Sequence, residues 1–407
     1  MMESRSERRQ GAPATESERR EWGVYVHIPF CSARCDYCDF ATWTDRAHLV
    51  DEYVDACVAH ARAQHDEGRL PDATSVFFGG GTPSLLPGPT LARILDAIPR
   101  AEGAEVTVEC NPDSVDEEKL RDYAAAGVNR VSFGVQSMRA HVLLALGRTH
   151  DRDNVARAVA AARAAGIDRV NLDLIYGTPG ESVADWEATL TDALALDPEH
   201  VSAYALTVEP GTPLGKAVAA GARPAPDDDD QALKYELADD VLTASGRPWY
   251  EISNWARPGE ECRHNLLYWR QGDYAAIGCA AHGHASGPEY SRRFWNLRTP
   301  ERYVEAIRTG VSPEAGEERL DQQEQVAEAL TLALRTREGV KVWPGDADDS
   351  PVASCLDEMS DLGLLTRDGG RVVLTRPGRL VANDVSARLL RALDDLSMWA
   401  APADGTR

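Results

Sequence analysis

The sequence predicts an α/β protein: a partial (β/α)6 barrel of parallel strands, followed by a C-terminal winged-helix-like α+β domain. Two observations support this fold class. Between residues 22 and 207, short apolar segments alternate with amphipathic helical segments, which is the pattern of repeated βαβ units. After residue 319, the order changes to helix, helix, hairpin and helix. A doubly wound open sheet is the alternative to the barrel.

Six segments in the first half of the chain are predicted to be buried strands, because each is rich in Val, Ile, Phe or Tyr. They are Trp22–Ile28, Ser75–Phe78, Glu105–Glu109, Arg130–Gln136, Arg169–Tyr176 and His200–Thr207. Helical segments separate them, as the crossover between parallel strands requires. These are Leu49–His65, Leu91–Ile98, Asp116–Ala126, Asn154–Ala165 and Ala184–Leu196.

The composition divides the chain into four parts. Residues 1–21 are polar throughout, so we expect a disordered leader without a secretory signal. Residues 22–230 form the barrel and end in the stretch 221–230, a predicted loop before a helix beginning near Gln231. Residues 231–318 form a connecting region of helical and aromatic-rich segments. Residues 319–407 form the winged-helix-like domain, with helices at Gln325–Arg335, Ser354–Leu365 and Leu380–Leu396 and a hairpin turn at 368–370.

The charge and the cysteine content narrow the class of protein. A formal net charge of −23 argues against free nucleic acid as a partner, because phosphate neutralisation needs a basic surface. No apolar stretch reaches the roughly 18 residues of a transmembrane helix. Eight cysteines in 407 residues do not form a disulfide scaffold, and a reducing, cytoplasmic location fits best. Peripheral contact with a membrane and the oligomeric state stay open.

Three cysteines, Cys31, Cys35 and Cys38, lie in the loop after the first predicted strand. Thiolates at this CxxxCxxC spacing suit an iron–sulfur cluster, in which each cysteine ligates one iron. Three ligands on a four-iron cluster leave one iron open to a small molecule. A zinc site completed by His27 or another histidine is the alternative.

Every predicted strand ends in polar residues or glycine, and in a barrel these ends meet at one face. Gly79, Gly80 and Gly81 allow close approach of a ligand to the backbone. Glu109 and Asp173 can hold ribose hydroxyls, and Arg148 can bind a carboxylate. An amine, a carboxylate and a ribose occur together in S-adenosylmethionine.

With these motifs the sequence resembles the radical S-adenosylmethionine proteins. The segments YVHIPF before the cysteines, GGGTPSLL, ECNP, VNRVSFGVQS, LGRTH, NLDLIYGTPGES and YALTVEPGTPL resemble the oxygen-independent coproporphyrinogen III oxidases and their relatives in porphyrin metabolism. The resemblance covers about residues 22–400 and is strongest to the heme-chaperone branch of that family.

The resemblance implies a role for each matching position. Cys31, Cys35 and Cys38 would hold a [4Fe–4S] cluster, whose open iron would bind the methionine amine and carboxylate of S-adenosylmethionine. The implied cofactor contacts are Tyr25, Tyr37, Gly80, Gly81, Thr82, Glu109, Gln136, Arg148 and Asp173. After the sixth strand the register leaves two candidates, Ala205 and Thr207.

The segment His264-Asn265-Leu266-Leu267-Tyr268-Trp269 matches an HNxxYW motif of the chaperone-like members. Histidine is a common axial ligand of iron porphyrins, so His264 is the first candidate to bind heme. His282 and His284 are the rivals. A hydrogen-bonded structural histidine is the other interpretation of His264.

Two functions follow from the resemblance. The first is a heme chaperone that binds heme and delivers it to recipient hemoproteins, without a catalytic residue of its own. The second is a radical decarboxylase of coproporphyrinogen III. The decarboxylases usually extend the motif to CxxxCxxCxC, whereas Phe40 stands at that position here. They also carry a longer ordered segment before the barrel, and the 21 polar residues at this N-terminus are expected to be too short and hydrophilic to replace it. Both features favour the chaperone.

Overall fold

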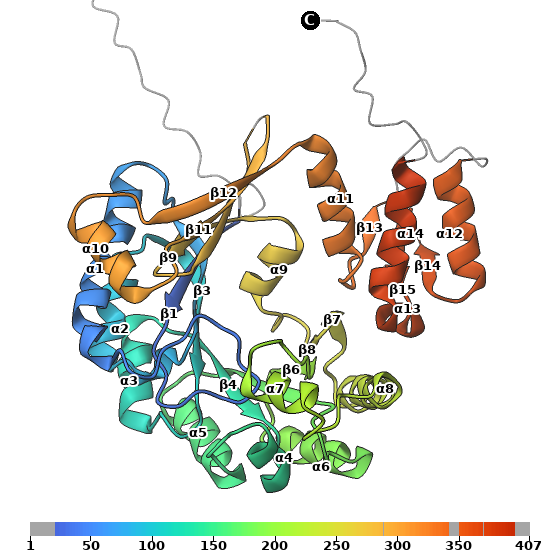
Figure 1. Cartoon of the computed structure of the whole chain (residues 1–407), viewed down its shortest axis with the longest axis horizontal. Helices are drawn as coiled ribbons and strands as arrows, with labels where there is room; N and C mark the ends of the chain where they lie inside the picture. The colour runs from blue at the N-terminus through green and yellow to red at the C-terminus, as the bar shows by residue number, and fades with distance from the viewer. Residues whose placement is uncertain (1–20, 288, 342–349, 369, 395–407) are drawn as a thin grey trace, which may run out of the picture.

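The computed structural model describes residues 21–287, 289–341, 350–368 and 370–394. The predicted leader, except for Glu21, lies outside these ranges. A strongly curved sheet forms the larger part of the molecule, and a smaller helical unit lies to one side of it (Figure 1). No helix in the described ranges is long and apolar enough to cross a membrane.

Six parallel strands form the centre of the sheet and pair in the order of the chain. They are β1 (Trp22–Ile28), β2 (Ala73–Gly80), β3 (Arg100–Cys110), β4 (Arg130–Gln136), β5 (Arg169–Tyr176) and β6 (His200–Ala205). Each strand is followed by a crossover that returns the chain to the same starting edge. The predicted fold class, a partial (β/α)6 barrel, is confirmed.

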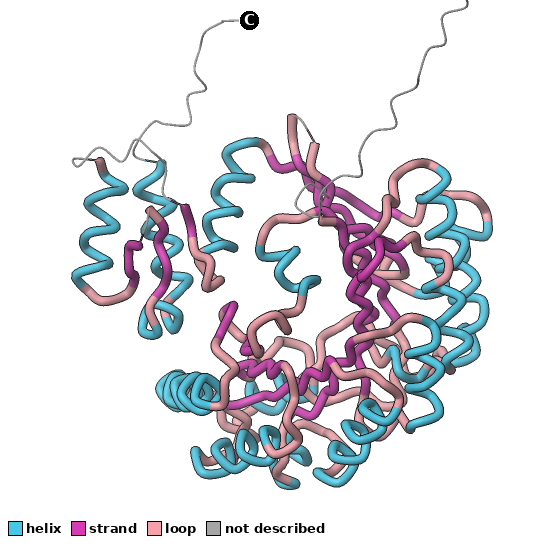
Figure 2. The backbone as a smooth tube through the Cα atoms, turned by 180° about the vertical axis from the view of Figure 1, so that it is seen from behind, coloured by secondary structure: helices cyan, strands magenta, loops and turns pink. Residues whose placement is uncertain are grey.

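Helices cover the convex side of this sheet (Figure 2). They are α1 (Val50–Asp66), α2 (Gly88–Leu95), α3 (Glu117–Ala126), α4 (Ala140–Ala145), α5 (Arg152–Ala164) and α6 (Val183–Leu194), with short 3₁₀ turns at η2 (Ala47–Leu49) and η3 (Pro83–Leu85). Side chains alternate along each strand. Val24, Val26 and Ile28 of β1 therefore enter the buried core with the helices, whereas Tyr25 and His27 face the concave side.

Six further strands extend the sheet at both ends. Beyond β6 lie β8 (Asn254–Ala256) and β7 (Trp249–Glu251), and beyond β1 lie β9 (Asp273–Ile277), β10 (His282–Ala285), β11 (Ser291–Asn296) and β12 (Glu314–Leu320). Four helices connect them: α7 (Pro213–Ala219), α8 (Asp228–Ala244), α9 (Arg263–Trp269) and α10 (Pro300–Arg308). The region predicted to connect two domains therefore contributes strands to the first sheet, whose two edges are β7 and β12.

The aspartate-rich stretch before α8 corrects one expectation. Residues 221–230 were expected to form a loop, but α8 already begins at Asp228. The Asp227 side chain caps the helix by accepting a hydrogen bond from the backbone of Asp230. Asp228, Asp229 and Asp230 occupy the first turn, where negative charge favours a helix N-terminus.

The C-terminal unit follows the predicted order of helix, helix, hairpin and helix. It contains α11 (Gln322–Ala333), α12 (Pro351–Asp361), α13 (Arg376–Leu380) and α14 (Ala382–Asp394), with β13 (Val340–Lys341), β14 (Leu365–Asp368) and β15 (Arg371–Leu374). The strands β14 and β15 form the antiparallel hairpin, and Gly369 at its turn lies outside the described ranges. Leu334, Leu356, Met359 and Val385 form a separate buried core.

A buried ion pair joins this unit to the barrel. Arg379 of α13 donates from both terminal nitrogens to Asp239 of α8, at 3.1 and 2.6 Å. Its guanidinium also lies 4.4 Å from the centre of the Trp249 ring. The Arg379 side chain is 3% exposed, so the pair is largely removed from solvent screening.

We predict that Arg379→Met lowers the free energy of unfolding by about 3 kcal/mol, because it leaves the Asp239 carboxylate buried without its charged partner. Arg388→Met is the control, since the Arg388–Glu358 pair is exposed and such pairs contribute about 0–1 kcal/mol. Urea denaturation followed by circular dichroism measures both. Equal losses in the two variants would show that the Arg379 pair does not join the units.

Candidate functional site

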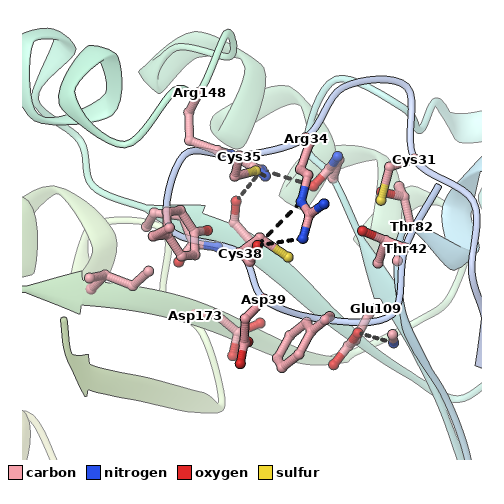
Figure 3. Close-up of a pocket in the computed structure, with 18 of the residues that line it drawn as sticks. Cys31, Arg34, Cys35, Cys38, Asp39, Thr42, Thr82, Glu109, Arg148 and Asp173 are labelled. Carbon is pink, nitrogen blue, oxygen red and sulfur yellow. Dashed lines mark hydrogen bonds between the residues drawn. The ribbon is translucent and has the colours of Figure 1, made fainter. Parts of the chain in front are cut away.

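The carboxyl ends of the six central strands surround a cavity of about 470 Å³ (Figure 3). It collects residues that lie as far apart in the sequence as Cys31 and Thr207. The predicted site residues that line it are Cys31, Cys35, Tyr37, Cys38, Gly80, Gly81, Thr82, Glu109, Gln136, Arg148, Asp173 and Thr207. Ala205 also lines the cavity, so both candidates after β6 stay open.

The cysteine loop crosses one side of this cavity. Backbone hydrogen bonds close its base: Cys31 donates to Trp43 at 3.0 Å and Trp43 donates to Pro29 at 2.8 Å. Cys31, Cys35 and Cys38 are half-buried free thiols. Burial raises the pKa of the Cys31 and Cys38 thiols.

Two polar side chains donate to two of the three thiols. The Thr82 hydroxyl donates to the Cys31 sulfur at 3.6 Å, and Arg148 Nη1 donates to the Cys35 sulfur at 3.3 Å. Within the described ranges, no three His, Cys, Asp or Glu side chains converge on a point that one metal ion would occupy. Separate thiols that share one cavity, with donors aimed at the sulfurs, fit a four-iron cluster, because each cysteine then binds a different iron.

His27 does not fit the alternative of a zinc site. Its Nε2 lies 2.9 Å from the carbonyl oxygen of Ala41 and its Nδ1 lies 3.1 Å from the Tyr25 hydroxyl. A carbonyl only accepts, so Nε2 carries the proton and the Tyr25 hydroxyl donates to Nδ1. Burial lowers the pKa of His27 to about 4. With both nitrogens engaged, His27 instead fixes the end of the cysteine loop.

Tyr25 therefore lies where the sequence alone did not place it. It lines a second, smaller cavity of about 230 Å³ on the concave side of the sheet, which shares Glu109, Asp173 and Tyr204 with the first. Tyr25 reaches the cysteine loop through His27 and Ala41. Tyr25 therefore supports the loop and also lies beside the two carboxyl groups of the cofactor cavity, and its role as a cofactor contact stays a prediction.

The glycines at the end of β2 are required by close packing against β1 and the residues that follow it. Gly80 has a φ of 107°, and a Cβ there would lie 2.3 Å from the His27 ring. A Cβ on Gly81 would lie 2.7 Å from the carbonyl oxygens of Ile28 and Phe30. Residues with side chains would displace the cysteine loop, because it packs directly on this turn.

Two partly buried carboxyl groups face the cavity from β3 and β5. Glu109 accepts a hydrogen bond from the Gly80 backbone at 3.1 Å. Burial and the nearby charge of Asp173 raise the pKa of Glu109 to about 8. Burial also raises the pKa of Asp173, although Ser132 and Asn171 donate to it at 2.7 and 2.8 Å and oppose that shift.

Ser132 and Asn171 are supporting residues that the motif analysis missed. Both lie on the concave face of their strands, at the alternating positions where the other face is apolar. That alternation is a sequence signal which could have identified them.

Arg148 and Gln136 complete the wall near β4. Arg148 Nη2 donates to Asn111 Oδ1 at 2.8 Å and to the carbonyl of Gly134 at 2.9 Å, so its guanidinium is fixed before a ligand binds. Gln136 has a φ of 63°, a conformation that few residues other than glycine adopt. The register shift between Gly134 and Gln136 turns the strand end toward the cavity.

His264 is not accessible as an axial heme ligand in this structure. It is 0% exposed, and its ring nitrogens bond the Ser75 and Tyr268 hydroxyls at 2.9 and 2.8 Å. Burial lowers its pKa to about 3. The geometry therefore supports the structural interpretation of this histidine, which holds α9 against β2.

The other two candidate heme ligands, His282 and His284, differ in their exposure to solvent. His284 is almost fully buried, with Nδ1 3.1 Å from the carbonyl of Gly272. His282 is exposed, and its ring centre lies 5.9 Å from that of Trp295. Of the three candidates, His282 presents its ring to solvent.

The comparisons with known proteins agree with this architecture. Residues 25–193 match the radical SAM superfamily and residues 320–381 match the HemN C-terminal domain. The chain is 43% identical over 377 residues to the heme chaperone HemW of Mycobacterium tuberculosis, covering 91% of this chain and 95% of that protein. It is 34% identical over 380 residues to heme chaperone HemW of Bacillus subtilis, covering 91% and 99%.

A solved structure shows the same fold. Coproporphyrinogen III oxidase HemN of Escherichia coli aligns with a TM-score of 0.77 at 21% identity, covering 91% of this chain and 90% of that chain. Fold and matches together define a radical SAM protein with a HemN-type C-terminal domain. Within that class, the chain belongs to the HemW family.

We predict that Glu109→Gln changes how stability depends on pH. The Glu109 pKa rises from 4.5 to about 8 on folding, so the folded protein holds an extra proton between these values. The free energy of unfolding of the cofactor-free wild type should therefore fall as the pH rises through this window. Glu109→Gln should lack that part of the decrease.

Denaturant titrations at pH 5 and pH 8.5 measure this effect. Glu102→Gln, an exposed position on β3, should keep the wild-type pH dependence. Parallel curves for wild type and Glu109→Gln would contradict the buried, protonated state of Glu109.

Proposed function

We propose that this protein is a heme chaperone that carries a [4Fe–4S] cluster and S-adenosylmethionine, binds heme and delivers it to recipient hemoproteins in the cytoplasm. The observation that carries the proposal is the 43% identity to a heme chaperone over nearly the full length of both chains. The cavity supports the cofactor part, because three free thiols and the predicted contact residues share it.

Different residues of this cavity would bind the cluster and S-adenosylmethionine. Cys31, Cys35 and Cys38 would hold three irons, leaving the fourth open to the methionine amine and carboxylate. Gly80, Gly81 and Thr82 offer backbone groups and a hydroxyl to the methionine end, where the turn has no space for further side chains. When bound, the reduced cluster supplies an electron that can cleave the sulfonium of S-adenosylmethionine.

The charged side chains of the cavity would bind and orient the polar groups of S-adenosylmethionine. Arg148 is held by Asn111 and Gly134 and presents a fixed cation toward a carboxylate. Glu109 and Asp173 accept hydroxyl or ammonium donors. A cationic ligand favours their ionised forms, so binding there releases protons.

The alternative function is a radical decarboxylase of coproporphyrinogen III. The observation that favours it is the shared fold with the Escherichia coli oxidase. Phe40 argues against it, because this residue supplies neither a thiol nor a hydrogen bond where those oxidases usually have a cysteine.

We predict that the anaerobically reconstituted protein binds about four irons per chain through three thiolates. The triple variant Cys31→Ala, Cys35→Ala, Cys38→Ala should lose both iron and broad visible absorption. Cys57→Ala is the control, because Cys57 is buried in α1 away from the loop. Retention of iron and colour in the triple variant would refute the cluster assignment.

We predict that the reconstituted protein binds heme with a shifted Soret band and does not convert coproporphyrinogen III to protoporphyrinogen IX. Anaerobic incubation with S-adenosylmethionine and reductant, followed by oxidation and chromatography of the porphyrins, tests the second part. Escherichia coli HemN under the same conditions is the positive control. Turnover by this protein would favour the decarboxylase.

A further inference from the structure

Phe40 is an exposed aromatic side chain on the wall of the cofactor cavity. It is 62% exposed and lines the cavity between Asp39 and Ala41. The backbone beside it is fixed, because the Ala41 carbonyl accepts the hydrogen bond from His27. The Phe40 backbone is therefore held at the cavity, while its side chain remains largely uncovered by the described part of the protein.

The cavity wall has two chemically different parts. The part formed by the cysteine loop and the ends of β2 to β4 is polar and contains the thiols, the glycines, Glu109 and Arg148. At the ends of β5 and β6, the apolar residues Ile175, Tyr204, Ala205 and Leu206 lie beside the polar Asp173, Thr207 and Glu209. Ile175 and Leu206 are almost buried, so Phe40 and Tyr204 offer most of the exposed apolar surface. We call Phe40 and the four apolar residues of these strand ends the apolar wall. Apart from Ala205, one of the two candidate contacts after β6, the cofactor contacts named above lie outside the apolar wall, so most of this wall has no ligand assigned to it.

One cation of the cysteine loop lies near Phe40. Arg34 lines the same cavity, and its Nε and Nη2 donate to the Cys38 carbonyl at 3.4 and 3.3 Å (Figure 3). These bonds place the exposed guanidinium over the loop that carries Phe40. Asp39 and Glu209 also line the cavity, so an anionic group of a ligand is repelled from them and directed toward Arg34.

We propose that the apolar wall is the heme site, with Phe40 packing on the face of the porphyrin and Arg34 pairing with a propionate. This inference rests on the proposed function and names the place where the cargo binds. A flat macrocycle gains from burial against an exposed ring and from offset stacking on it. A guanidinium is suited to a carboxylate. A cysteine in place of Phe40 would offer little of that surface.

Access to the cysteine loop distinguishes this heme site from one on α9. A porphyrin on the apolar wall covers the cavity that contains Cys31, Cys35 and Cys38. Bound heme should therefore slow the extraction of cluster iron by a chelator. Heme bound beside His264 or elsewhere on α9 would leave the cysteine loop open.

The test uses the full-length reconstituted protein titrated with iron protoporphyrin IX. Phe40→Ala should raise the Kd for heme about tenfold, whereas Phe40→Trp should keep it near the wild-type value. Arg34→Ala should also raise the Kd, and the remaining affinity should depend less on salt. Tyr290→Ala is the matched control, because Tyr290 is an aromatic residue of comparable kind, 37% exposed and outside the cavity, and should not change the Kd.

Calorimetry with S-adenosylmethionine and timed iron extraction by a ferrous chelator complete the experiment. Heme should slow extraction in the wild type and lose this effect in Phe40→Ala. Wild-type heme binding with an unchanged Kd in Phe40→Ala overturns the inference and leaves the chaperone proposal standing. Loss of S-adenosylmethionine affinity alone in Phe40→Ala would make Phe40 a cofactor contact and also overturn it. Absence of heme binding by the wild type would instead refute the chaperone proposal itself.

Discussion

The parallel pairing of β1 to β6 is the constraint on which the site depends. Parallel strands in chain order place six carboxyl ends at one edge of the sheet. Side chains as far apart in the chain as Cys31 and Thr207 therefore line the same cavity. An antiparallel arrangement would send every second loop to the opposite edge, and the thiols after β1 would be separated from the glycine turn at the end of β2 and from Arg148 after β4. The crossover helices and their apolar core maintain this pairing.

Burial gives the site its electrostatic character. It raises the pKa of Asp173 and of the Cys31 and Cys38 thiols, and it raises the pKa of Glu109 to about 8. The ligand-free cavity therefore holds protons on thiols that bind iron only as thiolates, and on Glu109 below that pH. Metal binding requires thiolates, and a cationic ligand favours carboxylates. Loading of the proposed cofactors and loss of protons are therefore coupled. The hydrogen bond from Thr82 opposes the rise in the pKa of Cys31.

The sequence predicts the strand order and most of the cavity wall, because alternation, glycines and polar strand ends are local signals. It does not predict the state of His264, whose partner Ser75 lies 189 residues away in the chain. The same limit applies to His27, whose partner Ala41 lies 14 residues away in the chain. The left-handed φ of Gln136 depends on a shift between neighbouring strands. The strands β9 to β12 are short and mixed in polarity, and only their pairing with β1 and with each other identifies them as part of the first sheet.

The hydrogen bonds of His27 connect β1 to the cysteine loop. His27, the penultimate residue of β1, binds the Ala41 carbonyl and so fixes the backbone directly after Phe40. The turn at Gly80 exists to accommodate that same imidazole. His27 therefore links two features of the site. It supports the loop next to Phe40, and it requires a glycine at position 80.

The most direct test of the account is electron–nuclear double resonance on the reduced, reconstituted protein with S-adenosylmethionine labelled with ¹⁵N at the methionine amine. A three-cysteine cluster with one open iron predicts a hyperfine coupling between the cluster spin and the labelled nitrogen. A cluster spectrum without that coupling, unchanged on addition of the labelled molecule, would contradict the assignment of this cavity to both groups.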